Sequence, residues 1–190
     1  NTLAMVLATS EADYEPVVEW NVTGAHNSGG LDLQDDVWDG VKFKNPFYMP
    51  MTTGPAMVMA DGKFLGSRTS HWVNPGDEAL IYVSKALSVR TDATEVESAE
   101  REEVSLARHN YYRTTLTGTL SVQNLRSTPI TIVIRKHLSG SVLSAEGDPV
   151  KVLGTAGPGQ LNPSNKLTWT IDVPAGEARS LEYRYQYLAN

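Results

Sequence analysis

The chain has 190 residues, a formal net charge of -6 and no cysteine. This length fits one large β domain or two small ones, and either can bury a hydrophobic core. The acidic balance argues against a phosphate-binding surface, so we expect no nucleic-acid partner. The lack of cysteine excludes disulfides, thiolate nucleophiles and cysteine-ligated zinc. No apolar run approaches the roughly 18 residues of a membrane span.

The first half of the chain predicts short strands separated by turns. Alternation of apolar and polar residues, the mark of a strand with one buried face, recurs here, whereas a helical period is hard to find. Asp61-Gly62 readily takes the positive φ angles of a type I′ turn, so residues 56–60 and 63–66 should pair as a tight hairpin. Further strands are expected at residues 3–8, 16–22, 78–84 and 87–91.

The second half contains the clearest strand pattern. Residues 111–124 alternate between an apolar and a polar face, and the apolar face consists of Tyr112, Leu116, Leu120 and Val122. After a loop that ends at Pro129, residues 130–137 alternate in the same way with Ile130, Ile132 and Ile134. We therefore expect these two segments to pair as a hairpin.

Two more alternating segments follow, joined by a turn at residues 174–178. Their apolar faces consist of Leu167, Trp169, Ile171 and Val173 in the first segment and Leu181, Tyr183, Tyr185 and Tyr187 in the second. Residues 71–84 and 167–185 share an order of features: a tryptophan, a turn with proline, glycine and an acid, then an alternating strand. This echo fits either an internal repeat or convergence on common turn chemistry.

An acidic tract separates the two halves. Residues 94–105 contain five glutamates and one arginine, which fits a solvated linker or a short helix, and such an acidic run is typical of a solvated surface. The expected fold class is all-β, with antiparallel sandwiches in two halves. We place an N-terminal β domain at residues 1–93, an acidic linker at residues 94–103 and a C-terminal immunoglobulin-like β-sandwich at residues 104–190.

Motifs for catalysis or cofactor binding do not occur in the sequence. There is no G-x-S-x-G nucleophile elbow, and none of the four histidines belongs to an H-E-x-x-H pair. The glycine-rich segments at residues 24–30 and 154–160 match neither a P-loop nor a dinucleotide-binding turn. We therefore predict a protein that is not an enzyme and has no cofactor, and we assign no catalytic, cofactor-binding or metal-binding residue.

A calcium loop is the best metal alternative. Asp32, Gln34 and Asp36 alternate as oxygen ligands do at the start of an EF-hand loop. The pattern then fails, because Val37 stands where the turn glycine belongs and Phe43 stands where the bidentate glutamate belongs. A solvated surface loop is therefore favoured over calcium binding.

A tyrosine stripe is the best carbohydrate alternative. Tyr183, Tyr185 and Tyr187 recur at period two and would form a flat stacking face if solvent reached them. Leu181 continues the same face, and such a stripe more often belongs to a core or an interface. Exposure of these rings separates the two interpretations.

Several segments together resemble a known bacterial family. These segments are residues 51–66, 74–84, 88–91, 95–101, 117–142 and 162–187. They resemble the C-terminal β domain of mucoidy-inhibitor-like bacterial proteins over about residues 46–188, and residues 1–45 lie outside the resemblance. The resemblance implies a β domain that follows an N-terminal region and a coiled coil. It implies no catalytic residue set.

We hypothesise a non-catalytic β-sandwich module for protein–protein interaction or assembly in a larger bacterial protein of the cell envelope. Its partner would be another protein or the upstream region of the same polypeptide, because the chain starts at Asn1 without a signal segment, as an excised fragment would. The contact is expected at an exposed strand edge or an apolar face. The alternatives are a carbohydrate- or calcium-binding module and an unrecognised hydrolase.

Overall fold

The computed structural model describes residues 7–22, 36–106, 109–154 and 160–189. These residues form twelve strands and no helix, so the fold is the all-β, antiparallel sandwich type that the sequence predicts. Accordingly, the described part of the chain contains no helix able to cross a membrane. The chain divides into two compact units. Unit 1 comprises residues 1–18 and 38–85, and unit 2 comprises residues 19–37 and 86–190.

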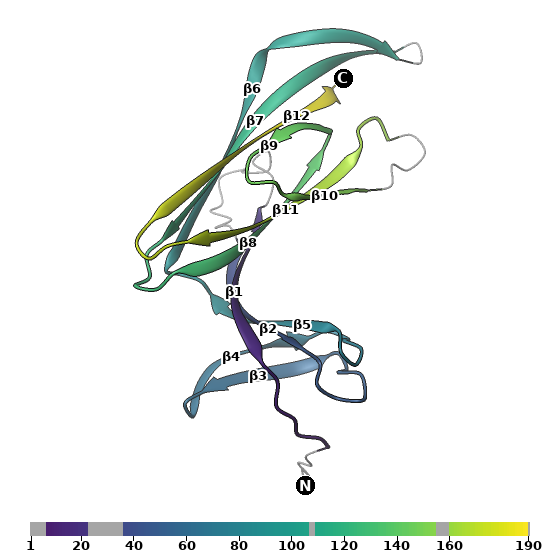
Figure 1. Ribbon diagram of the computed structural model, residues 1–190. Coiled ribbons are helices and arrows are strands. Elements are labelled where there is room, and N and C mark those ends of the chain that lie inside the picture. Colours follow the sequence, from purple (N-terminus) through teal and green to yellow (C-terminus); the bar gives the residue numbers. More distant parts are fainter. Residues whose placement is uncertain (1–6, 23–35, 107–108, 155–159, 190) are drawn as a thin grey trace. The chain divides into compact units, whose positions relative to one another are not determined.

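Unit 1 contains strands of two sheets (Figure 1). One has the order β1-β2-β5 and contains parts of β1 (Tyr14–Val22) and β2 (Asp36–Lys44) together with β5 (Glu78–Lys85). The other is the hairpin of β3 (Gly54–Ala60) and β4 (Lys63–Ser70). An isolated bridge between Met51 and Val73 continues the pairing of this hairpin.

Unit 2 is a sandwich of two layers (Figure 1). One layer has the order β6-β7-β12-β9 and contains β6 (Val89–Leu106), β7 (His109–Asn124), β9 (Ser141–Ala145) and β12 (Ala178–Ala189). The other has the order β10-β11-β8 and contains β8 (Ile130–Ser139), β10 (Val150–Leu153) and β11 (Ser164–Val173); β1 follows β8 in this sheet.

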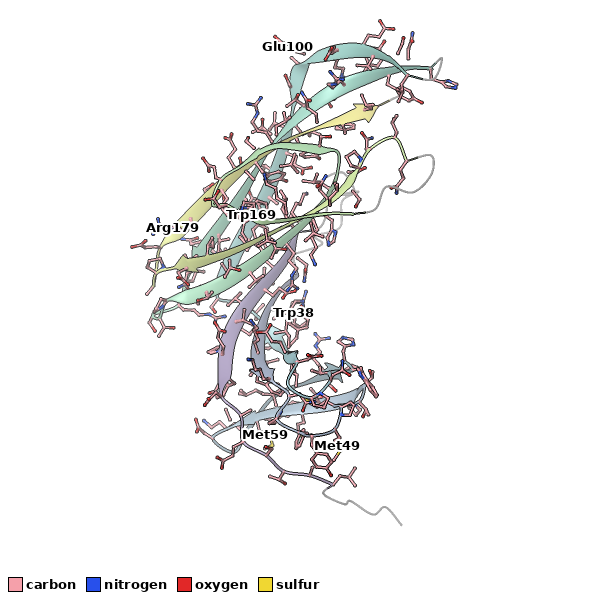
Figure 2. The ribbon with its side chains drawn as sticks, turned by 45° about the vertical axis from the view of Figure 1, so that its right-hand side comes forward. Trp38, Met49, Met59, Glu100, Trp169 and Arg179 are labelled. Atoms are coloured by element: carbon pink, nitrogen blue, oxygen red, sulfur yellow. The ribbon has the colours of Figure 1, made fainter. Side chains whose placement is uncertain are left out.

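The core of unit 2 follows from the predicted alternation. Alternate side chains of β7, β8, β11 and part of β12 are buried, among them Leu116, Leu120, Ile132, Ile134, Leu167, Trp169 and Tyr183. Each large side chain of this kind contributes about 1.5–3 kcal/mol when it is removed from water. Trp169 lies in the interior of unit 2 (Figure 2), where its indole N–H donates to the Glu146 carbonyl at 2.7 Å. The indole is therefore buried without an unsatisfied donor.

The predicted hairpin at Asp61-Gly62 is confirmed. Asp61 has φ 49° and Gly62 has φ 72°, the two positive angles that a type I′ turn requires. Ala60 pairs with Lys63 directly beside the turn. A register shift between Val58 and Met59 then leaves one additional residue on β4.

The predicted hairpin of residues 111–124 and 130–137 is wrong. β7 pairs with β6 and β12, whereas β8 pairs with β11, so the chain changes layers between the two strands. Both strands have a continuous apolar face. Both faces are buried when the two strands lie in opposite layers and face each other across the core. Alternation alone does not distinguish this arrangement from pairing side by side.

The predicted linker at residues 94–103 is also wrong, because these residues belong to β6 and most of them pair with β7. Ion pairs join Arg101 to Glu97 at 2.6 Å and Arg113 to Glu102 at 2.7 Å. β6 is the edge strand of its sheet, and charged side chains on an edge strand hinder pairing with further chains. The acidic tract can therefore belong to a sheet. The two compact units consequently do not follow the predicted division into residues 1–93 and 104–190.

Most strands predicted in the first half are present. The segments at residues 16–22 and 78–84 lie in β1 and β5, and β6 begins at Val89 within the segment at residues 87–91. For the segment at residues 3–8, residues 3–6 lie outside the described residues. Leu7 and Ala8 form no strand and are exposed.

Candidate functional site: an exposed hairpin face in unit 1

A buried asparagine organises unit 1. The Asn45 side chain donates to the carbonyls of Met49 and Val73, each at 3.1 Å, and accepts from the Phe47 N–H at 3.0 Å. The Asn45 backbone N–H donates to the Asp77 carbonyl at 2.9 Å. One side chain therefore fixes the loop after β2 to the start of the turn before β5.

The same network recurs around Asn124 in unit 2. Its side chain donates to the carbonyls of Thr128 and Val173 and accepts from the Arg126 N–H. Its backbone N–H donates to the Glu177 carbonyl at 2.9 Å. The spacing along the chain matches in both networks, because each asparagine side chain donates to the backbone carbonyl four residues later and accepts from the backbone N–H two residues later.

The segments next to the two networks also match. Each asparagine begins a loop that ends at a proline five residues later, Pro50 or Pro129. Each distal turn contains a glycine with positive φ, Gly76 at 76° and Gly176 at 73°. The weak sequence echo between the two halves therefore corresponds to a shared three-dimensional network.

Strand pairing extends this correspondence. β2 pairs with β5 in unit 1 as β7 pairs with β12 in unit 2, and β3 pairs with β4 as β8 pairs with β11. Counted from Asn45 and Asn124, Met57 takes the position of Lys136, and Met59 takes the position of Leu138. β3 is therefore the unit 1 counterpart of β8.

The counterpart positions differ in exposure. Lys136 and Leu138 are buried in unit 2, whereas Met57 is 68% exposed and Met59 is 57% exposed. Phe64, which pairs with Met59 across the hairpin, is 60% exposed. Directly paired residues and residues two apart on a strand share one face of a sheet. We call Met57, Met59 and Phe64 the hairpin face; Figure 2 labels Met59 on it.

The opposite side of the hairpin packs inside unit 1. A Cβ atom at Gly66 would lie 2.1 Å from the Val83 carbonyl oxygen, so β4 crosses β5 at a distance that only glycine allows. Arg68, two residues farther on the same side, places its guanidinium 4.0 Å from the centre of the Trp38 ring. These contacts hold the inner side of the hairpin and leave the hairpin face to solvent.

A second cluster, in unit 2, is closed to solvent. The Lys136 ammonium lies 3.0 Å from a carboxylate oxygen of Glu95, and each side chain is 3% exposed. The Tyr183 hydroxyl donates to the same carboxylate at 2.6 Å. Burial, followed by this hydrogen bond, raises the pKa of Tyr183 well above its usual value, and burial also raises the pKa of Tyr185. The cluster joins the two layers of the sandwich and offers no access to a large ligand.

The tyrosine stripe belongs to the core. Tyr183 is 1% exposed and Tyr185 is 6% exposed, while Tyr187 is half-buried. Gly118 faces Tyr183 across the pair of β7 and β12 and leaves room for the ring, since a Cβ atom there would lie 2.1 Å from the tyrosine Cζ. Tyr183 and Tyr185 therefore cannot stack against a sugar, which favours the core interpretation.

The calcium alternative depends mainly on residues that the structure does not describe. Asp32 and Gln34 lie outside the described residues, and Asp36 begins β2. Within the described ranges, no three histidine, aspartate or glutamate side chains gather as metal ligands would.

Sequence reasoning did not identify the hairpin face or the asparagine networks. Residues 56–60 are all apolar, so the sequence does not show which side of this strand is covered. A signal for the networks was present, since an asparagine followed by proline five residues later occurs at both Asn45 and Asn124.

Comparison with known proteins gives no match: no family model matches the chain, and neither a curated protein nor a solved structure does. The resemblance to the C-terminal β domain of mucoidy-inhibitor-like proteins and the immunoglobulin-like assignment therefore stay predictions. The function is inferred from the geometry of the chain itself.

Proposed function

We propose that the chain is a non-catalytic β-sandwich module that binds another protein through the hairpin face. The observation that carries this proposal is the exposure of three large apolar side chains on one face of β3 and β4. Contiguous apolar surface of this kind marks interaction sites in proteins that otherwise bury such residues. The opposite side of the hairpin packs against Val83 and Trp38, so the hairpin face is the side that remains open to a partner.

The side chains of the hairpin face suit protein recognition. Methionine and phenylalanine are enriched in protein interfaces, and the flexible thioether of methionine adapts to an irregular partner surface. β3 contains no charged residue, so its contact would be apolar at the centre. The net charge of -6 favours a partner with a basic rim through complementary electrostatics.

The ligand-binding alternatives have less support. The carbohydrate alternative depended on an exposed tyrosine stripe, and Tyr183 and Tyr185 are buried. The absence of nucleophile and metal-binding motifs from the sequence supports a role without catalysis. A protein contact is therefore the function that the described residues support best.

A site-specific photocrosslinking experiment tests the proposal. A photoreactive phenylalanine analogue replaces Phe64, and in a matched control it replaces Tyr112, an aromatic residue of unit 2 that is 42% exposed. Both proteins are mixed with a bacterial envelope extract and irradiated. We expect one saturable protein adduct at position 64 and none at position 112.

Substitution of the face supplies the second arm. Met57→Gln together with Met59→Gln should abolish the adduct while leaving the thermal melt unchanged, because both side chains are exposed. No specific adduct at position 64, combined with saturable binding of a glycan or Ca²⁺ to the same protein, would falsify the proposal.

A further inference from the structure

Strand β10 forms one edge of the unit 2 sandwich (Figure 1). Among the described residues it pairs on one side only, with β11, and the register runs without interruption from Val150 opposite Thr168 to Leu153 opposite Asn165. An edge strand presents backbone N–H and C=O groups on its outer side, where a further strand can pair. β10 is therefore positioned to accept an extended segment of another chain.

One backbone hydrogen bond fixes which groups of β10 face outward. The Gly154 N–H donates to the Ser164 carbonyl at 2.7 Å. In an antiparallel pair, residues that bond to the partner strand alternate with residues whose backbone groups point away from it. Counting back along the register, Val152 bonds to β11, whereas Lys151 and Leu153 direct their N–H and C=O groups outward. The outer edge therefore offers two donors and two acceptors.

The side chains of β10 are mostly apolar and exposed. Val150, Val152 and Leu153 are 66%, 53% and 70% exposed. Because side chains alternate along a strand, the two valines lie on one face of the sheet, and Lys151 and Leu153 lie on the other. A strand paired with β10 would consequently cover apolar side chains on both faces of the sheet.

The two edges of the other layer of unit 2 are less suited to a further strand. β6 carries a series of acidic side chains, which hinder pairing. The pairing of β9 with β12 has a register shift between Arg184 and Tyr185, and such an irregularity bends the edge. β10 has an uninterrupted register and one charged residue, Lys151. Of these three edges, β10 is therefore the best suited to bind a strand.

Lys151 indicates the chemistry of the partner strand. Neither β10 nor the segment of β11 that pairs with it, residues 165–168, contains an acidic residue, and that segment adds Lys166. Two copies of β10 paired with each other would place two Lys151 ammonium groups on one short strand pair, which disfavours a second copy of this chain. An acidic side chain next to Lys151 would instead attract it across the pair.

We propose that the outer edge of β10 binds an extended segment of another protein, in which apolar and acidic residues alternate, as an added strand of the sheet. Backbone hydrogen bonds to Lys151 and Leu153 hold the segment. Its apolar residues lie beside Val150 and Val152, and its acidic residues lie on the face of Lys151. This site belongs to unit 2 and is independent of the hairpin face of unit 1.

Amide hydrogen exchange measured by NMR tests the edge. The probe is a synthetic peptide with blocked ends, Thr-Val-Glu-Val-Glu-Val-Thr, added to the 190-residue chain. In the free chain, the Val152 N–H should exchange slowly and those of Lys151 and Leu153 rapidly. Peptide at about ten times its Kd should slow exchange at Lys151 and Leu153 about tenfold.

A charge exchange tests the selectivity. Lys151→Glu should reverse the preference, so that a peptide with lysines in place of its glutamates binds at least about threefold more tightly than the original peptide. Lys63→Glu is the matched control, because it changes the net charge equally at an exposed position of unit 1. This control variant should still prefer the acidic peptide.

A proline tests the backbone contact. Leu153→Pro removes one outward N–H and keeps the bonds to β11, since proline is tolerated on the open side of an edge strand. Binding of the acidic peptide should be lost, while a thermal melt verifies that the variant folds as the unsubstituted chain does.

The outcomes decide the inference without reference to the proposed function. It is overturned if neither peptide binds, if the unsubstituted chain binds both peptides equally, or if binding persists in the proline variant. Slow exchange at Lys151 and Leu153 in the free chain overturns it as well, because the edge would then already be paired. Capture of a protein at position 64 depends on the hairpin face and is unaffected by each of these results.

Discussion

Asn45 and Asn124 hold equivalent hydrogen-bond networks in the two units of one chain. Each is almost completely buried, and each ties the loop that follows it to a turn far along the sequence. A buried amide that lacks these partners would destabilise the fold, so each network specifies one arrangement of the strands around it. Substitution of either asparagine should therefore destabilise the unit that contains it.

Replacing either asparagine with alanine should therefore destabilise its own unit. Asn124→Ala leaves the carbonyls of Thr128 and Val173 without a side-chain donor, which costs about 1–3 kcal/mol. Gln123→Ala is the control, because Gln123 is an exposed amide next to Asn124 and its loss should change the stability by less than about 0.5 kcal/mol. Urea denaturation followed by tryptophan fluorescence measures both. Equal effects at Asn124 and Gln123 would contradict the structural role.

The buried ion pair in unit 2 should show strong coupling. Lys136→Met removes the ammonium beside Glu95 inside the sandwich and should cost about 3–5 kcal/mol. Adding Glu95→Gln should recover part of that loss, because no charge then stays buried without its partner. A double-mutant cycle from urea denaturation gives the coupling free energy, and additive effects would show that the two charges do not interact.

Alkaline pH should destabilise unit 2. The pKa values of Tyr183 and Tyr185 are raised in the folded chain. Above pH about 10, both side chains therefore stay protonated in the folded chain, whereas the same tyrosines ionise in the unfolded chain. The unfolded state then binds fewer protons, and the free energy of unfolding falls by up to about 1.4 kcal/mol per pH unit for each tyrosine. The stabilisation is complete below pH about 10. Tyr183→Phe should reduce this slope, and Tyr48→Phe, at an exposed site, should not.

The hairpin turn should depend on Gly62. Its φ of 72° is costly for a β-branched residue, so Gly62→Val should destabilise unit 1 by about 1 kcal/mol or more. Gly54→Ala is the control, since Gly54 has open space around its Cβ position and no positive φ. Thermal melts compare the two, and an unchanged midpoint for Gly62→Val would refute the turn.

Oxidation should distinguish the methionines. Met57 and Met59 are exposed, whereas Met49 and Met51 are half-buried, so hydrogen peroxide should convert the first two to sulfoxides first. Mass spectrometry of peptides from the folded chain measures the four rates. The difference should disappear in urea. Equal rates in the folded chain would contradict the exposure of the hairpin face.

Local structure could be predicted from the sequence because its causes are local. The alternation around Leu116, Leu120 and Ile132 depends only on the two-residue period of a strand, and the Asp61-Gly62 turn depends only on two backbone angles. The burial of Tyr183 followed from the size of its ring and from Leu181 on the same face. These features required no knowledge of distant segments.

The remaining features depend on segments far apart in the chain. Alternation in β7 and β8 identifies two apolar faces, but the choice between one sheet and two depends on β11 and β12, which come later. Glu95 looked like part of a solvated tract because its partner Lys136 comes from another layer. The hairpin face was missed because sequence periodicity does not report whether a second layer covers a strand.

The chain leaves unit 2 after Val37 and returns to it at Ala86, and these two residues are joined by a backbone hydrogen bond of 3.0 Å. The segment between them is therefore an insertion whose ends are already closed. Changing the length of a closed loop alters its closure entropy only slightly, by roughly 0.6 kcal/mol for each doubling. Residues 38–85 can accordingly be lengthened, shortened or exchanged during evolution at little cost to the sandwich that holds their ends, so the proposed binding face of the hairpin is a replaceable part.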